Sequence, residues 1–111
     1  PGMQFYVLMD KDTSSIAASF CNIMQYNGAA LLAGEPLRHN ALKYGETVSA
    51  RFGISGLYLT VSTVEFDEYS HAVDGVLMPD ITIPYIAQDY LTGRDAMLDK
   101  LLEIIKRDIK N

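Results

Sequence analysis

The sequence predicts an α/β fold in which a βαβ unit is followed by a β-hairpin and a C-terminal helix. Three patterns support this prediction. An apolar run ends in a charged turn, and a helical pattern and a second apolar run follow it. Two runs of alternating polar and apolar residues then flank a glycine-containing loop, as in a hairpin. The end of the chain carries the wide apolar stripe of an amphipathic helix.

The βαβ unit comes first in the chain. Residues 3–9 are mostly apolar on both faces of a strand, which suits the interior of a parallel sheet. Residues 10–12 form a charged turn, and residues 15–26 have the pattern of a helix that ends at Asn27-Gly28. Residues 29–33 form the second strand. Since a helix separates the two strands, we expect them to be parallel, with a right-handed crossover.

The predicted helix over residues 15–26 has features at its start and along one side that set its position. Asp12, Thr13 and Ser14 are all suitable N-cap residues. Ala17 and Ala18 are small enough to allow a close approach to the sheet. An apolar stripe is formed by Ile16, Phe20 and Ile23, with Ala17, Cys21 and Met24 beside it.

The second half of the chain changes pattern. Residues 47–52 and 57–64 alternate and predict the hairpin, and an acidic loop follows over residues 65–75. Residues 81–83 form a brief extended segment, and residues 85–92 are expected to be irregular. The final helix is predicted over 96–110, with acidic residues at its start and basic residues at its end, as the helix dipole favours.

Composition excludes several function classes. The net charge of −5, without a basic cluster, argues against nucleic acid as a partner. The one cysteine, Cys21, cannot form an intrachain disulfide, and no apolar stretch is long enough to span a bilayer. His39 and His71 lie far apart without companions at metal-ligand spacing, and no phosphate-binding glycine motif is present. We therefore expect no metal and no cofactor.

The first strand, turn and helix suggest a place for a nucleophile. A strand that passes through a tight turn into a helix lifts one side chain out of the sheet. The helix N-terminus then supplies N–H groups and positive potential for a developing oxyanion. Ser15, rather than Ser14, is the expected residue at the tip. The structural alternative is that Thr13 or Ser14 merely caps the helix.

Five segments in order carry a family resemblance: VLMDKDTSSIAASF, NGAALLAGEP, YGETVSARFGISGLYLTVST, LMPDITI and DYLTGRDAMLDKLL. Together they resemble the C-terminal half of the catalytic domain of S41 serine peptidases. That family includes the tail-specific (C-terminal processing) proteases, the tricorn core protease and interphotoreceptor retinoid-binding protein. The match covers nearly all of residues 1–111 and is nearest to a bacterial branch. It implies a ClpP/crotonase-like fold and serine-type hydrolysis of peptide bonds.

The resemblance also implies roles for particular residues. Thr13-Ser14-Ser15-Ile16-Ala17 falls on the nucleophile segment of the family, which makes Ser15 the catalytic nucleophile. Asp74 is the candidate acid, because it is the nearest carboxylate before Pro79-Asp80. The candidates for contacts with the substrate and its oxyanion are Ser14, Ile16, His39 and Asn40.

The chain departs from the family pattern where a base is expected. The register of the lysine base of the processing proteases falls on His39-Asn40, and Lys43 is out of register. The usual Gly-Gly of the same loop is Arg38-His39, and the acidic position after the serine is Ala18. In the tricorn-like branch the base is a histidine from an upstream segment. The base is therefore expected from upstream sequence or, as an alternative, from His39.

Three functions remain open on these grounds. The first is a serine peptidase, of which residues 1–111 are a fragment without the full catalytic set, inactive when isolated. The second is a non-catalytic module that keeps the fold and binds peptide or lipid. The third is an acyl-CoA enzyme of the crotonase type. The expected partners are a peptide or protein substrate and an upstream segment of the same parent chain, with a homo-oligomer left open. The family resemblance implies a periplasmic, cell-envelope or secreted location.

Overall fold

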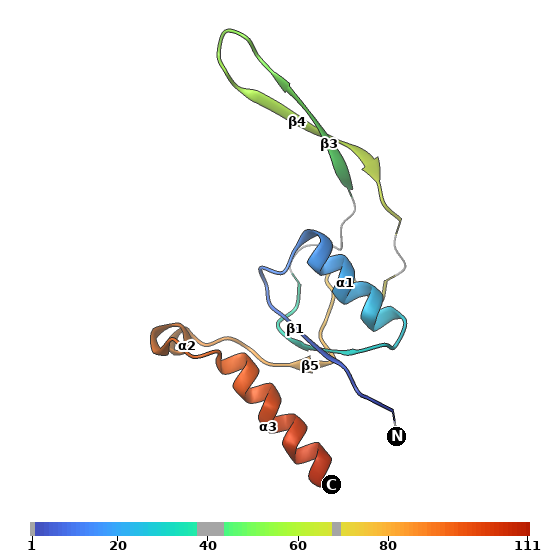
Figure 1. The fold of residues 1–111 in the computed structure, drawn as a ribbon, viewed down its shortest axis with the longest axis vertical. Coiled ribbons are helices and arrows are strands. Elements are labelled where there is room, and N and C mark those ends of the chain that lie inside the picture. Colours follow the sequence, from blue (N-terminus) through green and yellow to red (C-terminus); the bar gives the residue numbers. More distant parts are fainter. Residues whose placement is uncertain (1, 38–43, 68–69) are drawn as a thin grey trace.

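The structure is a computed structural model, and it describes residues 2–37, 44–67 and 70–111 (Figure 1). It is a mixed α/β chain. Its elements, in chain order, are β1 (Tyr6–Met9), α1 (Ser15–Tyr26), β2 (Leu31–Gly34), β3 (Tyr44–Arg51), β4 (Tyr58–Glu65), β5 (Ile81–Thr82), α2 (Ala87–Thr92) and α3 (Ala96–Lys110).

Three of the strands form a parallel sheet in the order β1-β2-β5. β1 pairs with β2 from Tyr6 opposite Leu31 to Met9 opposite Gly34. β5 joins the other side of β2, with Ala33 opposite Ile81. The predicted βαβ unit is therefore confirmed, although both of its strands are shifted or shorter than the apolar runs suggested. All three strands end at the same edge of the sheet, where α/β folds place their sites.

Side chains of the sheet alternate between two apolar clusters, as the pleat of a strand requires. Leu32 and its neighbour Ala33 are both fully buried, but they belong to different clusters. The cluster on the α1 side contains Met9, Ala18, Cys21, Leu32, Leu37 and Leu77. The cluster on the α3 side contains Ala33, Ile83, Met97 and Leu101. Figure 1 shows α1 and α3 on opposite sides of the strands, so a helix covers each face of the sheet.

The face that α1 turns to the sheet differs from the predicted apolar stripe. Ile16, Phe20 and Ile23 are 76%, 51% and 51% exposed, and Ala17 is exposed as well. The buried residues of α1 are Ala18, Ser19, Cys21 and Asn22. The helix is rotated so that small side chains face the sheet, where they allow a close approach, and the larger apolar residues face away from the strands.

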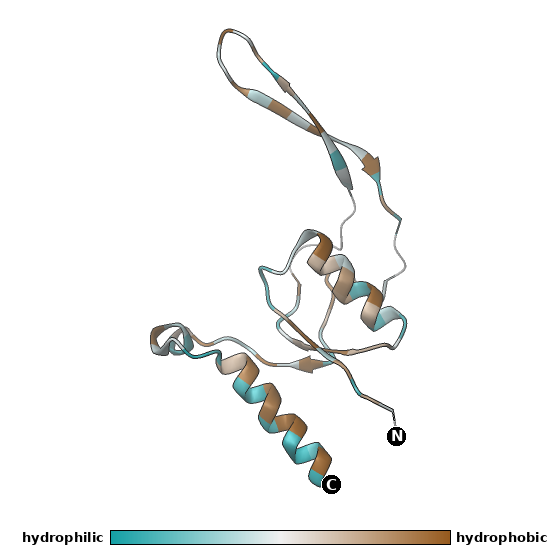
Figure 2. Cartoon of the chain, in the orientation of Figure 1, coloured by the Kyte–Doolittle hydropathy of each residue, from teal (hydrophilic) through white to brown (hydrophobic). Residues whose placement is uncertain are grey.

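The predicted hairpin is confirmed, and it projects from the rest of the molecule as an arm (Figure 1). β3 and β4 form a separate antiparallel sheet with pairs such as Val48–Val61 and Ala50–Leu59. Both strands are exposed along nearly their whole length. Figure 2 shows apolar and polar residues alternating along the arm. Since an isolated two-stranded hairpin is marginal in water, the apolar side of this arm is suited to contact another surface.

Residues 85–92 were expected to be irregular, and for most of them this was wrong, because residues 87–92 form α2. The Ile86 N–H donates to the carboxylate of Asp89 at 3.2 Å, which satisfies one amide at the start of the helix. Gly93 ends α2 in the left-handed conformation, with φ of 66°. α2 has only six residues and buries none of them. It therefore lacks the apolar periodicity from which a helix is predicted in a sequence.

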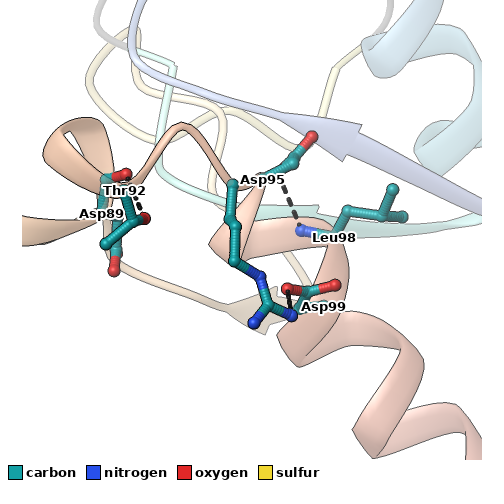
Figure 3. Close-up of polar contacts among 6 residues, drawn as sticks. Asp89, Thr92, Asp95, Leu98 and Asp99 are labelled. Carbon is teal, nitrogen blue, oxygen red and sulfur yellow. Dashed lines mark hydrogen bonds and ion pairs between the residues drawn. The ribbon is translucent and has the colours of Figure 1, made fainter.

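The last helix, α3, has the predicted bounds. Asp95 caps it by accepting a hydrogen bond from the Leu98 N–H at 3.0 Å (Figure 3). The Arg94 guanidinium, just before this cap, pairs with the carboxylate of Asp99 at 2.8 Å. Met97 and Leu101 are the buried residues of the helix and pack against the sheet.

Candidate functional site

Ser15 is the first residue of α1 and lies just past the carboxyl end of β1. Its φ is 55°, a left-handed value that residues with a Cβ rarely adopt. Ser14 before it is extended, with φ of −147° and ψ of 171°. The backbone therefore changes from extended at Ser14 to left-handed at Ser15, and Ser15 is exposed. Strained backbone of this kind is enriched at functional sites, and a serine at a strand-to-helix turn matches the nucleophile position of several hydrolases.

The turn before Ser15 (Asp10–Ser14, the β1–α1 turn below) is held by its own side chains. The carboxylate of Asp10 accepts hydrogen bonds from the N–H of Asp12 at 2.9 Å and of Thr13 at 2.8 Å. The Thr13 hydroxyl accepts from the Asp10 N–H at 3.0 Å and donates to the Asp10 carboxylate at 3.1 Å. This network fixes the turn and leaves Thr13 engaged away from the helix N-terminus.

The hydroxyls of Ser14 and Ser15 make no hydrogen bond with the residues that the structure describes. Ser14 occupies the N-cap position, but its side chain does not cap the helix. The structural alternative, in which a hydroxyl of Thr13 or Ser14 serves as the cap, therefore does not account for this turn. Both serines are exposed.

The start of α1 also offers hydrogen-bond donors. The N–H groups of Ser15, Ile16 and Ala17 precede the first full helical turn and so lack an acceptor within the helix. No acidic residue lies in this first turn, so no carboxylate of the turn offsets the positive end of the helix dipole. The arrangement can stabilise a negatively charged oxygen close to the Ser15 hydroxyl.

Glu35 belongs to the same edge of the sheet and was not singled out from the sequence. It follows β2 directly, and its half-buried carboxylate faces the loops after β1 and β5. The N–H of Lys11 and the N–H of Tyr85 donate to its two oxygens. A carboxylate just after the central strand of a parallel sheet is the sequence signal that could have identified it.

A small cavity of about 130 Å³ opens beside the β1–α1 turn. It is lined by Leu8, Met9, Asp10, Thr13, Tyr85, Asp95 and Met97. Loss of solvent around the Tyr85 hydroxyl raises its pKa, and the negative charge of Asp95 raises it further. The Tyr85 hydroxyl is therefore harder to ionise than that of an ordinary tyrosine. Ser15 itself does not line this cavity.

Asp74 lies in a tight turn of a different kind. The N–H of Val73 and of Val76 each donate to the other residue's carbonyl oxygen, at 3.1 and 2.9 Å. Asp74 and Gly75 between them have φ of 49° and 76°, as the two central residues of a type I′ turn require. The Asp74 side chain is exposed, and no hydrogen bond joins it to Ser15. The Asp-Gly pair explains its conformation and is itself a recognisable sequence signal.

The remaining predicted site residues are placed as follows. Ile16 lies beside Ser15 and is largely exposed. His39 and Asn40 lie outside the described residues. The ring of His71 lies 5.0 Å from that of Tyr26, at the opposite end of α1 from Ser15. Asp80 accepts a hydrogen bond from the Leu32 N–H at 2.7 Å, which ties the start of β5 to β2.

Other kinds of site are not found in the described residues. Within residues 2–37, 44–67 and 70–111, no three His, Cys, Asp or Glu side chains are grouped so as to hold a metal ion. None of the helices in the described part of the chain combines the length and apolar character needed to cross a membrane. Comparison with known proteins gives no family model that matches the chain and no curated protein that resembles it.

Proposed function

We propose that this chain is the C-terminal part of the catalytic domain of a serine peptidase, with Ser15 as its nucleophile. The observation that carries the proposal is the setting of Ser15. It lies at a strand-to-helix reversal, with left-handed backbone, an exposed hydroxyl and adjacent helix amides. The order of the five sequence segments that resemble the S41 peptidases supports the same assignment. A parallel sheet covered by a helix on each face is compatible with the proposed ClpP/crotonase-like fold.

The chemistry follows from this geometry. The Ser15 oxygen attacks the carbonyl carbon of the scissile peptide bond, and its proton passes to a general base. The N–H groups at the start of α1, including that of Ile16, stabilise the oxyanion. The base returns the proton to the leaving amine, and water then hydrolyses the acyl ester. Since no described residue offers a base to Ser15, we assign the base to an upstream histidine, with His39 as the alternative.

Exposed apolar surface supports the proposal that an upstream segment of the parent chain completes the domain. Two apolar surfaces lie open to solvent. One is the face of α1 with Ile16, Phe20 and Ile23, and the other is the apolar side of the β3–β4 arm. Patches of this kind mark surfaces that contact other protein. We assign them to the upstream segment, and with the family assignment we place the parent protein in the periplasm, the cell envelope or the extracellular space. Alternatively, a second copy of the protein covers these apolar surfaces. Sedimentation of the full-length protein would reveal such a homo-oligomer.

A non-catalytic module that binds peptide or lipid is the second candidate. One observation favours it: the Ser15 hydroxyl has no hydrogen-bonded base among the described residues, and a serine without a base is a poor nucleophile. Peptide or lipid that copurifies with the full-length protein, without turnover, would support this function. A histidine within hydrogen-bond distance of Ser15 in the full-length protein would exclude it.

Labelling with a fluorophosphonate probe tests the peptidase proposal. The probe modifies activated serines, so the full-length wild type should be labelled and Ser15→Ala should not. Ser14→Ala is the matched control, because it removes the neighbouring exposed hydroxyl and should keep the labelling. Absence of labelling in the wild type, or equal labelling of Ser15→Ala, would reject the proposal.

A further inference from the structure

Glu35 lies at a place in the sheet from which its side chain reaches both neighbouring loops. β2 is the central strand, flanked by β1 and β5, and all three run in the same direction. The residue that follows β2 therefore lies between the loop after β1 and the loop after β5. Glu35 is that residue, and its own N–H donates to the Met9 carbonyl oxygen at 3.1 Å.

The two carboxylate oxygens of Glu35 bind one loop each. Oε2 accepts a hydrogen bond from the Lys11 N–H at 3.5 Å, a long bond to the β1–α1 turn. Oε1 accepts one from the Tyr85 N–H at 3.3 Å, in the segment between β5 and α2. The side chain is half-buried, so both bonds are partly shielded from water.

The Lys11 N–H differs from the other amides of the turn in having its acceptor outside the turn. The N–H groups of Asp10, Asp12 and Thr13 all bond to side chains within the turn itself. These bonds give the turn its shape but do not fix it against the sheet. The N–H of Lys11 is instead bound from outside the turn, by Glu35. This side-chain contact therefore adds to the backbone bond at Met9 and ties the middle of the turn to the end of β2.

We propose that Glu35 is a positioning residue whose carboxylate joins the β1–α1 turn to the segment after β5 and thereby sets the place of the Ser15 hydroxyl. Its effect on catalysis rests on the proposed peptidase function, whereas its effect on the two loops does not. A nucleophile displaced by about 1 Å can lose on the order of 10²-fold in rate without loss of substrate binding. Glu35 does not touch the reacting atoms and acts only through the turn.

The test uses the full-length protein with Glu35→Ala and Glu35→Gln, and Asp80→Asn as the matched control. Asp80 also binds a backbone N–H of the sheet, that of Leu32, but at the amino end of β5. Two quantities are measured: amide hydrogen exchange at Lys11 and Tyr85, and the rate of fluorophosphonate labelling against probe concentration.

In Glu35→Ala we expect exchange at both amides to quicken by about tenfold or more, since each loses a hydrogen bond. The maximal labelling rate should fall by about 10-fold to 100-fold, while the probe concentration for half-maximal rate stays unchanged. Glu35→Gln keeps one acceptor oxygen and should recover part of both losses. Asp80→Asn should change neither quantity, although it weakens the sheet.

The outcomes separate the two proposals. If the wild type is labelled at Ser15 and Glu35→Ala is labelled at the same rate, the positioning role is wrong and the peptidase function stands. If the wild type is not labelled, the peptidase function fails and amide exchange alone decides the role of Glu35. Unchanged exchange at Lys11 and Tyr85 in Glu35→Ala overturns the inference in either case.

Discussion

Met9 and Gly34 lie opposite each other at the ends of two parallel strands, so close that Gly34 has no room for a side chain. A Cβ at Gly34 would collide with the carbonyl oxygen of Met9 and would lie 2.9 Å from the sulfur of Met97. The φ of Gly34 is 127°, which only glycine adopts without strain. This close approach brings β1, β2 and α3 together at the edge where Ser15 and Glu35 lie.

Gly34→Ala should therefore destabilise the protein by about 3 kcal/mol or more, because steric overlap and backbone strain add. Urea unfolding followed by circular dichroism measures the loss. Gly28→Ala is the control: Gly28 also has positive φ, but a Cβ there would meet nothing within 4 Å. It should cost about 1 kcal/mol from strain alone. Equal losses in the two variants would contradict the close approach at Met9.

The left-handed backbone at Ser15 predicts an unusual order of stabilities. Glycine relieves the strain of a positive φ, whereas alanine keeps it, and both remove the hydroxyl. Ser15→Gly should therefore be about 1 kcal/mol more stable than Ser15→Ala in thermal or urea unfolding. In an ordinary first turn of a helix the order would be reversed, so a more stable Ser15→Ala would contradict the reversal of the chain at this residue.

The separation of the arm from the sheet predicts different effects for two leucines. Leu32 on β2 is fully buried in the apolar cluster on the α1 side of the sheet, whereas Leu59 on β4 is 51% exposed. Leu32→Ala should cost about 2–5 kcal/mol of unfolding free energy, since it leaves a cavity. Leu59→Ala should change the stability of the isolated 111-residue chain by no more than about 0.5 kcal/mol. Comparable losses would mean that the arm is part of the same core.

Burial of Cys21 predicts a pH dependence. Loss of solvent raises the pKa of the thiol, so the folded protein holds its proton more tightly than the unfolded chain does. The stability that Cys21 contributes is therefore full below the ordinary thiol pKa and is lost as pH rises through the raised value. Unfolding free energies measured between about pH 8 and pH 10 should decline more steeply for the wild type than for Cys21→Ala.

Alkylation checks the same feature independently. At pH 8 the folded wild type should react with iodoacetamide far more slowly than the urea-unfolded protein, because the thiol is both inaccessible and protonated. Equal rates in the two states would contradict the burial of Cys21 between α1 and the sheet.

Local signals in the sequence were enough to predict the long helices. Both α1 and α3 have the predicted bounds, because Asn27-Gly28 ends the first and Asp95 caps the second. The place of Ser15 at the start of α1 followed from the same signals. Its positive φ did not, since turn residues in the sequence do not specify which of them takes up the reversal.

Contacts between distant segments could not be predicted in this way. Nothing near Glu35 in the sequence indicates the Lys11 and Tyr85 amides that it binds, because strand order in the sheet brings them together. The sequence likewise does not specify which face of α1 packs on the sheet, because this depends on how closely the helix and the strands can approach each other. The small Ala18 and Cys21, rather than the larger Phe20, therefore meet the strands.

The central claim is that Ser15 is a nucleophile, and mapping of the labelled residue tests it most directly. Full-length protein is treated with a fluorophosphonate, digested, and sequenced by mass spectrometry. The phosphonyl adduct is expected on Ser15, with Ser14 unmodified. An adduct on any other residue, or an unmodified Ser15 under conditions that label an active control peptidase, would contradict it.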